Sequence, residues 1–127
     1  MVKTHKDLDI WKMSIALVKE IYALTESFPE NERFGLISQL RRAAVSIPSN
    51  IAEGSARNGN KEFIQFCYIA LGSLSEVETQ VMIAKELDFS NPISTNNILQ
   101  NIEIIRKKLL NFIKYLKTKG TTSNVNR

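Results

Sequence analysis

The chain has 127 residues, a formal net charge of +4, 43% hydrophobic residues and 24% charged residues, which is the balance of one ordinary globular domain. Its three prolines and five glycines are too few for many short strands joined by tight turns. The single cysteine, Cys67, excludes an internal disulfide, and no apolar run approaches the ~20 residues that span a membrane. Because no signal-peptide core lies near the start, we expect a cytoplasmic protein without a membrane partner.

The first predicted helix covers residues 8–28, where apolar residues recur at spacings of three and four. One row consists of Leu8, Trp11, Ile15, Val18 and Tyr22, and a second row beside it of Ile10, Leu17, Ile21, Leu24 and Phe28. Together the rows cover about half of the helix circumference, which is wider than the ~100° stripe of a simple surface helix. We therefore expect this helix to be buried on two sides and to end at Pro29.

The second predicted helix follows the turn at residues 29–32. Its apolar seam consists of Ile37, Leu40, Ala44, Ile47 and Ile51. Pro48 lies inside this pattern and removes one backbone hydrogen bond, which kinks a helix. Because the apolar phase continues across Pro48, we expect one bent helix that ends near Gly54 and residues 58–60.

Two more helical patterns complete the chain. The third predicted helix runs from about Lys61 to Leu87, with a seam of Phe63, Cys67, Ala70, Leu74, Val77, Val81 and Ala84. The fourth starts with Ser94 or Thr95 as its cap and stops at Gly120, with a seam of Ile98, Ile102, Ile105, Leu109, Phe112 and Leu116. We expect one domain over residues 1–120 and a disordered tail over residues 121–127.

Four helices of similar length with short connections predict the fold class. Sequential helices joined in this way pack as antiparallel neighbours, and seven-residue apolar spacing favours shallow crossing angles. The sequence therefore predicts an all-α protein, an antiparallel up-down four-helix bundle whose second helix is kinked at Pro48.

Residues for catalysis are not apparent in this pattern. His5 is the sole histidine and lies near the start of the chain, so no histidine pair for a metal exists. Cys67 occupies a core position, where a cysteine acts as a small hydrophobe. No glycine-rich phosphate loop is present. We expect no catalytic residue, no cofactor and no metal, and hence a protein that is not an enzyme.

Glu76 and Glu78 of the third helix are the candidate acid pair. Two positions apart, they point about 160° away from each other, so they cannot act on one substrate. We expect one of them to face a neighbouring helix and to pair with Arg41 or Arg42, a contact that sets helix register more than it adds stability.

Positive charge gathers towards the end of the chain. Residues 91–127 sum to +6, with Arg106, Lys107, Lys108, Lys114, Lys117, Lys119 and Arg127 against Glu103. Lys107 and Lys114 are seven apart, opposite the seam, and with Gln100 and Asn111 form a stripe suited to phosphates. A second possible set is Arg42, Arg57 and Lys61. The alternative interpretation is a solvated helix face with a basic tail.

Residues 36–79 carry several specific motifs. They are QLRRAA (Gln39 to Ala44), SIPSNIAEG (Ser46 to Gly54), EFxxF (Glu62 to Phe66) and IALGSLSEVET (Ile69 to Thr79). Together they resemble the four-helix-bundle family first noted as proteins encoded in intervening sequences of bacterial 23S rRNA genes. The resemblance implies an up-down bundle, continuous through Pro48, and a ring-shaped homopentamer. A related protein, the accessory protein of diversity-generating retroelements, is a basic pentamer that binds nucleic acid.

Two functions from different classes follow. The first is a non-enzymatic homo-oligomer whose basic surface contacts RNA or DNA without sequence preference. The second is a structural or adaptor bundle that binds a protein partner and no nucleic acid. The wide apolar face of the first helix supports oligomerisation in both cases, because a second copy would bury its excess.

Overall fold

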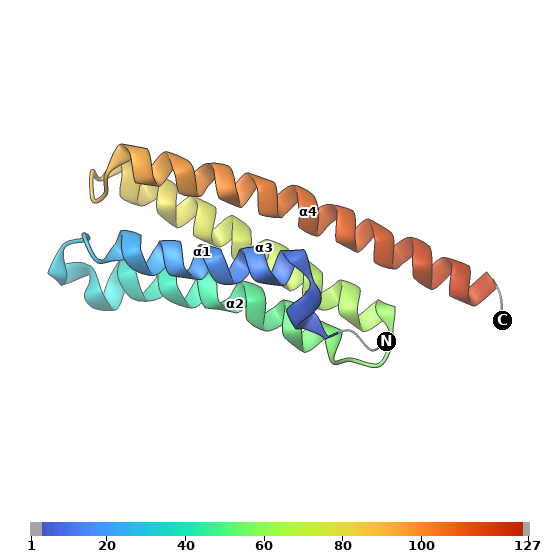
Figure 1. The fold of residues 1–127 in the computed structure, drawn as a ribbon. Helices are drawn as coiled ribbons and strands as arrows, with labels where there is room; N and C mark the ends of the chain where they lie inside the picture. The colour runs from blue at the N-terminus through green and yellow to red at the C-terminus, as the bar shows by residue number, and fades with distance from the viewer. Residues whose placement is uncertain (1–3, 126–127) are drawn as a thin grey trace.

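The computed structural model describes the backbone of residues 4–125 and the side chains of residues 4–6 and 8–119. This part of the chain forms four α-helices and no strand: α1 (Asp9–Thr25), α2 (Ser38–Ser55), α3 (Asn60–Glu86) and α4 (Pro92–Val125). Consecutive helices run in opposite directions and lie side by side (Figure 1), and α1 also packs against α4. The prediction of an all-α four-helix bundle is confirmed.

Three short helical segments accompany the four long helices. The 3-10 helix η1 (His5–Asp7) precedes α1, and the 3-10 helix η2 (Glu30–Glu32) and the π-helical segment η3 (Arg33–Ile37) join α1 to α2. Gly35 has non-helical backbone angles inside η3, with φ −109° and ψ −111°. The turn from α2 to α3 contains Gly59, whose φ of +132° is a conformation that favours glycine.

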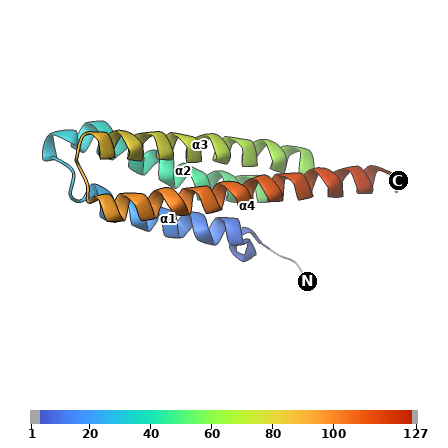
Figure 2. The same cartoon turned by 90° about the horizontal axis from the view of Figure 1, so that it is seen from above.

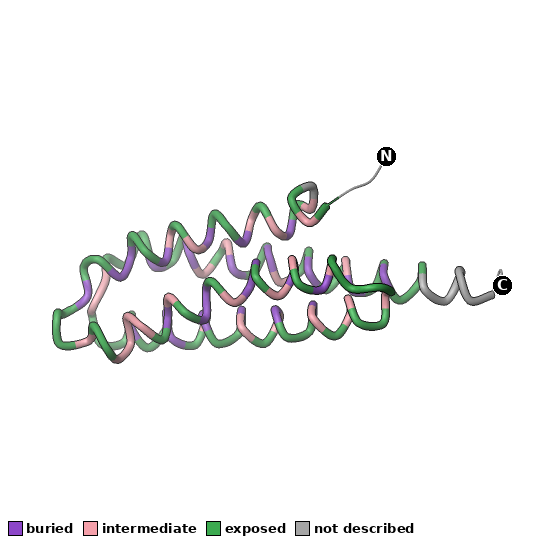
Figure 3. Tube along the Cα trace, turned by 90° about the horizontal axis from the view of Figure 1, so that it is seen from below, coloured by how far each residue is buried: buried purple, intermediate pink, exposed green. Residues whose placement is uncertain are grey.

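Buried residues recur every three or four positions and face the interior of the bundle (Figure 3). They include the predicted row Ile10, Leu17, Ile21, Leu24 and Phe28. The other row of the first helix is only partly covered, since Ile15 is 38% exposed and Tyr22 is 41% exposed. Within one chain, the row of α1 that contains Leu17 is therefore buried, and the row that contains Ile15 and Tyr22 stays partly exposed to solvent.

Pro48 lies inside α2 and is buried. The helix runs without interruption from Ser38 to Ser55, so the expected continuity through Pro48 is confirmed. A bend of α2 at this proline stays a prediction.

The start of α4 differs from the prediction. Pro92 is its first residue, and the Asn91 side chain accepts hydrogen bonds from the backbone N–H groups of Ile93 (2.8 Å) and Ser94 (3.4 Å). Capping by Ser94 or Thr95 was therefore wrong. Proline suits the first helical position because an N–H at that position would have no intrahelical partner, so its absence costs nothing. Asparagine before it is a favoured cap.

The end of α4 also lies later than predicted. The helix passes through Gly120 and continues to Val125, so Gly120 does not stop it. A glycine lowers helix propensity by about 1 kcal/mol, but it ends a helix only when the backbone leaves the helical conformation. Disorder of residues 121–127 stays a prediction, and residues 126–127 lie outside the described residues.

Candidate nucleic-acid interface

The exposed face of α4 is set by the way this helix buries its apolar seam. Ile98, Ile102, Ile105, Leu109, Ile113 and Leu116 are buried, with Ile113 replacing the predicted Phe112 at full burial. The opposite side presents five exposed polar residues, which we call the α4 ridge: Gln100, Lys107, Asn111, Lys114 and Thr118. At 1.5 Å rise per residue, Lys107 and Lys114 are about 10 Å apart along the helix axis.

Glu103, which precedes Lys107 by four positions on α4, is already paired. Arg106 Nη1 lies 2.5 Å from Glu103 Oε2, while Arg106 Nη2 lies 2.6 Å from Glu78 Oε1 of α3. The hydrogen bond to Glu78 is the main cause that raises the pKa of Arg106 above its ordinary value. The negative charge of Glu103 is therefore neutralised by Arg106. Among the residues that the structure describes, neither Lys107 nor Lys114 has a carboxylate within 4.0 Å.

The Glu78–Arg106 pair corrects one predicted partner. Glu78 does face a neighbouring helix and does pair with an arginine, but that helix is α4 rather than α2. Glu76 instead accepts a hydrogen bond from Gln80 Nε2 at 3.2 Å. Pairing of Glu76 or Glu78 with Arg41 or Arg42 was therefore wrong for both carboxylates. The spacing of Glu76 and Glu78 within α3 shows that their side chains point in different directions. It does not show which neighbouring helix each side chain faces.

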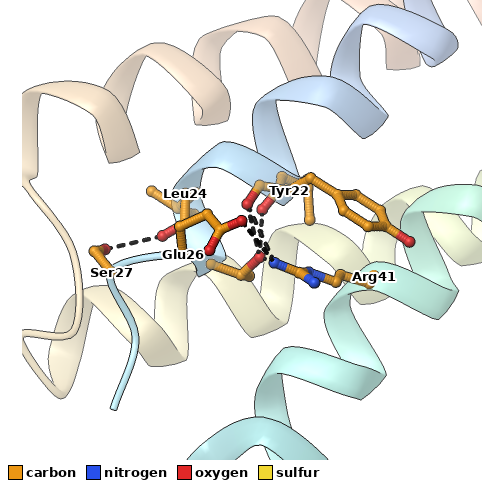
Figure 4. Close-up of polar contacts among 7 residues, drawn as sticks. Tyr22, Leu24, Glu26, Ser27 and Arg41 are labelled. Atoms are coloured by element: carbon orange, nitrogen blue, oxygen red, sulfur yellow. Dashed lines mark hydrogen bonds and ion pairs between the residues drawn. The ribbon is translucent and has the colours of Figure 1, made fainter. Parts of the chain in front are cut away.

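Arg41 closes the carboxyl end of α1 instead (Figure 4). Its Nε donates to Thr25 Oγ1 at 2.8 Å, and its Nη2 lies 3.4 Å from the Tyr22 carbonyl oxygen and 4.0 Å from Glu26 Oε1. The guanidinium carbon also lies 4.4 Å from the centre of the Tyr22 ring. A cation at the end of a helix stabilises carbonyl groups that lack an intrahelical partner, so Arg41 has a structural role.

The second predicted basic set is divided by the fold. Arg57 and Lys61 flank the α2–α3 turn, whereas Arg42 lies thirteen positions before the last residue of α2, about 20 Å along its axis. Arg57 is bound to Glu53 Oε2 at 2.9 Å and lies 5.0 Å from the centre of the Phe66 ring. Arg42, Arg57 and Lys61 are all exposed, but they do not form one cluster.

Two exposed tyrosines near the basic residues were missed by the sequence reasoning. Tyr115 is 54% exposed and lies 5.7 Å from Lys119 Nζ, measured from its ring centre. Tyr68 of α3 is 44% exposed, and its hydroxyl oxygen accepts a hydrogen bond from Lys117 Nζ at 2.9 Å. The alternation of lysine with a tyrosine across Lys114–Lys119 is the signal that could have identified Tyr115.

The acidic side chains and Cys67 of the described residues form neither a metal-binding group nor a reactive thiol. They contain no group of three His, Cys, Asp or Glu side chains placed to hold a metal ion. Burial raises the pKa of Cys67 to about 12, so its thiol stays protonated at neutral pH and is a poor nucleophile. Within the same part of the chain, no helix combines the length and apolar character needed to cross a membrane.

Comparison with known proteins places the chain in a family. Its residues 6–111 match the model of the 23S rRNA-intervening sequence protein. A similar solved structure is that of a protein of unknown function from the S23 ribosomal protein family of Bacteroides thetaiotaomicron VPI-5482. It shares 24% sequence identity at a TM-score of 0.76, over 83% of this chain and 98% of that chain, and so shows the same fold. No curated protein is significantly similar to the chain. Since the family model matches most of its length, the chain belongs to the family of 23S rRNA-intervening sequence proteins.

Proposed function

We propose that the protein is a non-enzymatic, oligomeric helical bundle that binds RNA or DNA through the α4 ridge. The observation that carries the proposal is the unpaired charge of Lys107 and Lys114 on a helix whose acid Glu103 is already bound to Arg106. Lysines in this state release counterions from phosphates when they bind, and this release supplies most of the affinity in sequence-independent recognition.

The partly covered row of α1 supports the oligomeric part of the proposal. Ile15 and Tyr22 are each about two-fifths exposed, and Val45 of α2, which lines the same hollow as Tyr22, is 40% exposed. A hollow of about 550 Å³ lies between these helices, lined by Tyr22, Ser38, Arg41, Arg42, Val45 and Ser46. A second copy on this face would repeat the α4 ridge in one assembly, which strengthens weak phosphate contacts through avidity.

Charge reversal on the ridge tests nucleic-acid binding. We expect the double variant Lys107→Glu, Lys114→Glu to lose binding to structured RNA and duplex DNA at ~50 mM salt, where phosphate contacts are strongest. Single Lys107→Gln should lower the slope of log affinity against log salt by about 1, because it removes one phosphate contact. Fluorescence anisotropy with labelled probes measures both effects.

The matched control lies on α1. Lys12 and Lys19 are also exposed and also seven positions apart, so Lys12→Glu, Lys19→Glu changes the net charge equally on another face. This control should keep most of the affinity. Equal loss in both double variants would indicate a response to net charge alone, and no binding by the wild type would refute the proposal.

The hollow between α1 and α2 also favours a second candidate, an adaptor that binds a protein partner. It has an apolar wall from Tyr22 and Val45 and two arginines, Arg41 and Arg42, which suits a partner with acidic and apolar side chains. An absorbance ratio at 260 and 280 nm of the purified protein separates the two candidates. Bound nucleic acid favours the first, and a co-purified protein without nucleic acid favours the adaptor.

A further inference from the structure

The last turns of α4 extend beyond the cover of α1. Asn101 Nδ2 of α4 donates to both carboxylate oxygens of Glu20 of α1, at 3.1 and 2.9 Å, which aligns the two antiparallel helices. Since α1 begins at Asp9, the part of α4 that follows Phe112 projects past it (Figure 2). Among the described residues, α1 therefore leaves the α4 surface that follows Phe112 uncovered.

A hollow of about 360 Å³ lies between α1 and α4, where α1 begins. Its lining consists of Leu8, Asp9, Ile10, Lys108, Asn111 and Phe112. Leu8, Ile10 and Phe112 provide apolar walls, while Asp9, Lys108 and Asn111 provide hydrogen-bonding groups. Apolar walls with a few polar groups are typical of small-molecule sites, and the volume is at the lower end of such pockets. This hollow is broadly open to solvent, so a ligand there would be only partly covered.

Tyr115 lies beside the hollow on the same helix. It follows Asn111 by four residues and Phe112 by three, so it is their neighbour on the surface of α4. Its ring centre is 6.1 Å from that of Phe112, which in turn packs edge-on against Phe63 at 5.3 Å. This contact with a partly buried aromatic pair supports the Tyr115 ring, while more than half of the residue stays exposed.

The charges distinguish what can enter the hollow from what can lie on the ridge. Asp9 and Lys108 carry opposite charges in the lining of the hollow, so the hollow offers a phosphate no net positive charge. The Asp9 carboxylate can accept hydrogen bonds from the amino groups of a nucleobase. Phosphates are favoured one turn away, where Lys107 and Lys114 lie without acidic partners. A base face is available to an aromatic ring only when the base is unpaired, as in a single strand.

We propose that Tyr115 and the adjoining hollow form a site for an unpaired nucleobase of single-stranded RNA or DNA, with the flanking phosphates on the α4 ridge. This site rests on the proposed function and names its preferred ligand. A base stacks on the Tyr115 ring in place of the flexible Lys119 side chain, whose Nζ lies 5.7 Å from the ring centre, or enters the hollow beside Asn111. The strand continues along Lys114 and Lys107. The protein therefore binds single strands more tightly than duplexes of the same sequence.

Substitution of Tyr115 tests the site. The probes are a fluorescein-labelled RNA single strand of about 12 nucleotides and a hairpin duplex of the same composition. We expect Tyr115→Leu to weaken single-strand binding by about 5- to 100-fold with an unchanged salt slope, because stacking releases no counterions. Tyr115→Phe keeps the ring and should stay within about 3-fold of the wild type. Duplex binding should not change in either variant.

A strand that carries 2-aminopurine provides a direct measurement of stacking. Its fluorescence should be quenched on binding to the wild type and to Tyr115→Phe, and not on binding to Tyr115→Leu. Circular dichroism checks that the variants keep their helices, which is expected for an exposed residue.

The outcomes separate this inference from the proposed function. If Tyr115→Leu binds single strands as the wild type does, the base site is wrong, whereas a loss confined to Lys107→Glu, Lys114→Glu still supports the ridge. Equal loss of single-strand and duplex binding in Tyr115→Leu would also overturn the base site. Binding to neither probe by the wild type would refute both proposals.

Discussion

Burial of the Cys67 thiol makes the stability of the native protein depend on pH. The side chain is 0% exposed, and burial raises its pKa from 9.0 to about 12. Between these values the unfolded chain releases the thiol proton, while the native chain keeps it. Native stability therefore falls as pH rises above 9, by up to about 1.4 kcal/mol per pH unit, and this thiol has no effect at lower pH.

Urea unfolding of the wild type and of Cys67→Ala measures this contribution. Lysines and tyrosines titrate in both proteins, so the difference between the two curves isolates the thiol. We expect the variant to be less stable near neutral pH, because it leaves a small cavity, and to lose less stability between about pH 9 and 11. Parallel curves over this range would show that the thiol is not protected from ionisation.

Arg106 has one ion-pair partner that the sequence could predict and one that it could not. Its place in a basic segment predicts an exposed cation, yet its side chain is only 20% exposed and is bound between Glu78 and Glu103. Glu103 precedes it by three residues and is a foreseeable partner. Glu78 is twenty-eight positions away in the chain, and only the packing of α3 against α4 brings the two groups together.

At the scale of helices, two glycines have opposite surroundings. A Cβ atom at Gly54 of α2 would lie 2.8 Å from Phe63 Cδ1 and 2.8 Å from Phe66 Cβ, so α2 and α3 approach closely there. A Cβ atom at Gly72 of α3 would meet nothing within 4 Å. The same substitution should therefore have opposite effects at the two positions.

We expect Gly54→Ala to destabilise the bundle by about 1–3 kcal/mol, because the helices must move apart. Gly72→Ala should stabilise it by about 0.5–1 kcal/mol, because alanine loses less backbone entropy in a helix. Thermal unfolding of the two variants against the wild type gives both values. A gain of stability at Gly54 would mean that α2 and α3 can separate at little cost.

The ends of helices were predicted less well than their faces. Asn91 can cap a helix as a serine or threonine can, and Pro92 suits the first helical position. Several starts of α4 were therefore compatible with the sequence. The buried faces were more secure, because each depends on a repeat over many residues. Phe112 and Ile113 are the exception on α4, since a small rotation of the helix decides which of the two side chains is fully buried.

At the scale of the whole molecule, the open α1–α2 face predicts assembly. Ile15, Tyr22 and Val45 are each 38–41% exposed on this face. We expect light scattering to give a mass larger than the 14.4 kDa protomer, and Tyr22→Glu, Val45→Glu to reduce it to that of a monomer with its helices intact. The two glutamates remove apolar contact area and must lose their hydration when a second copy binds, which opposes the contact between copies.

Ile93→Glu is the control for this experiment. Ile93 is 72% exposed at the start of α4, away from the α1–α2 hollow, and its substitution should leave the mass unchanged. A wild-type protein with the mass of one protomer would rule out oligomerisation. A change with Ile93→Glu alone would place the contact at the end of the bundle.

Local patterns in the sequence were enough to predict the four helices, a buried row on each of them and the concentration of positive charge in the last one. Each of these depends on residues within a few turns of one another, and a repeat of three or four positions is a local property. The tertiary structure decided which carboxylate binds which arginine, that one row of α1 stays half-open, and that α4 extends past α1 beside a hollow. These features depend on the rotation and register of helices against one another, which arise from packing between segments far apart in the chain.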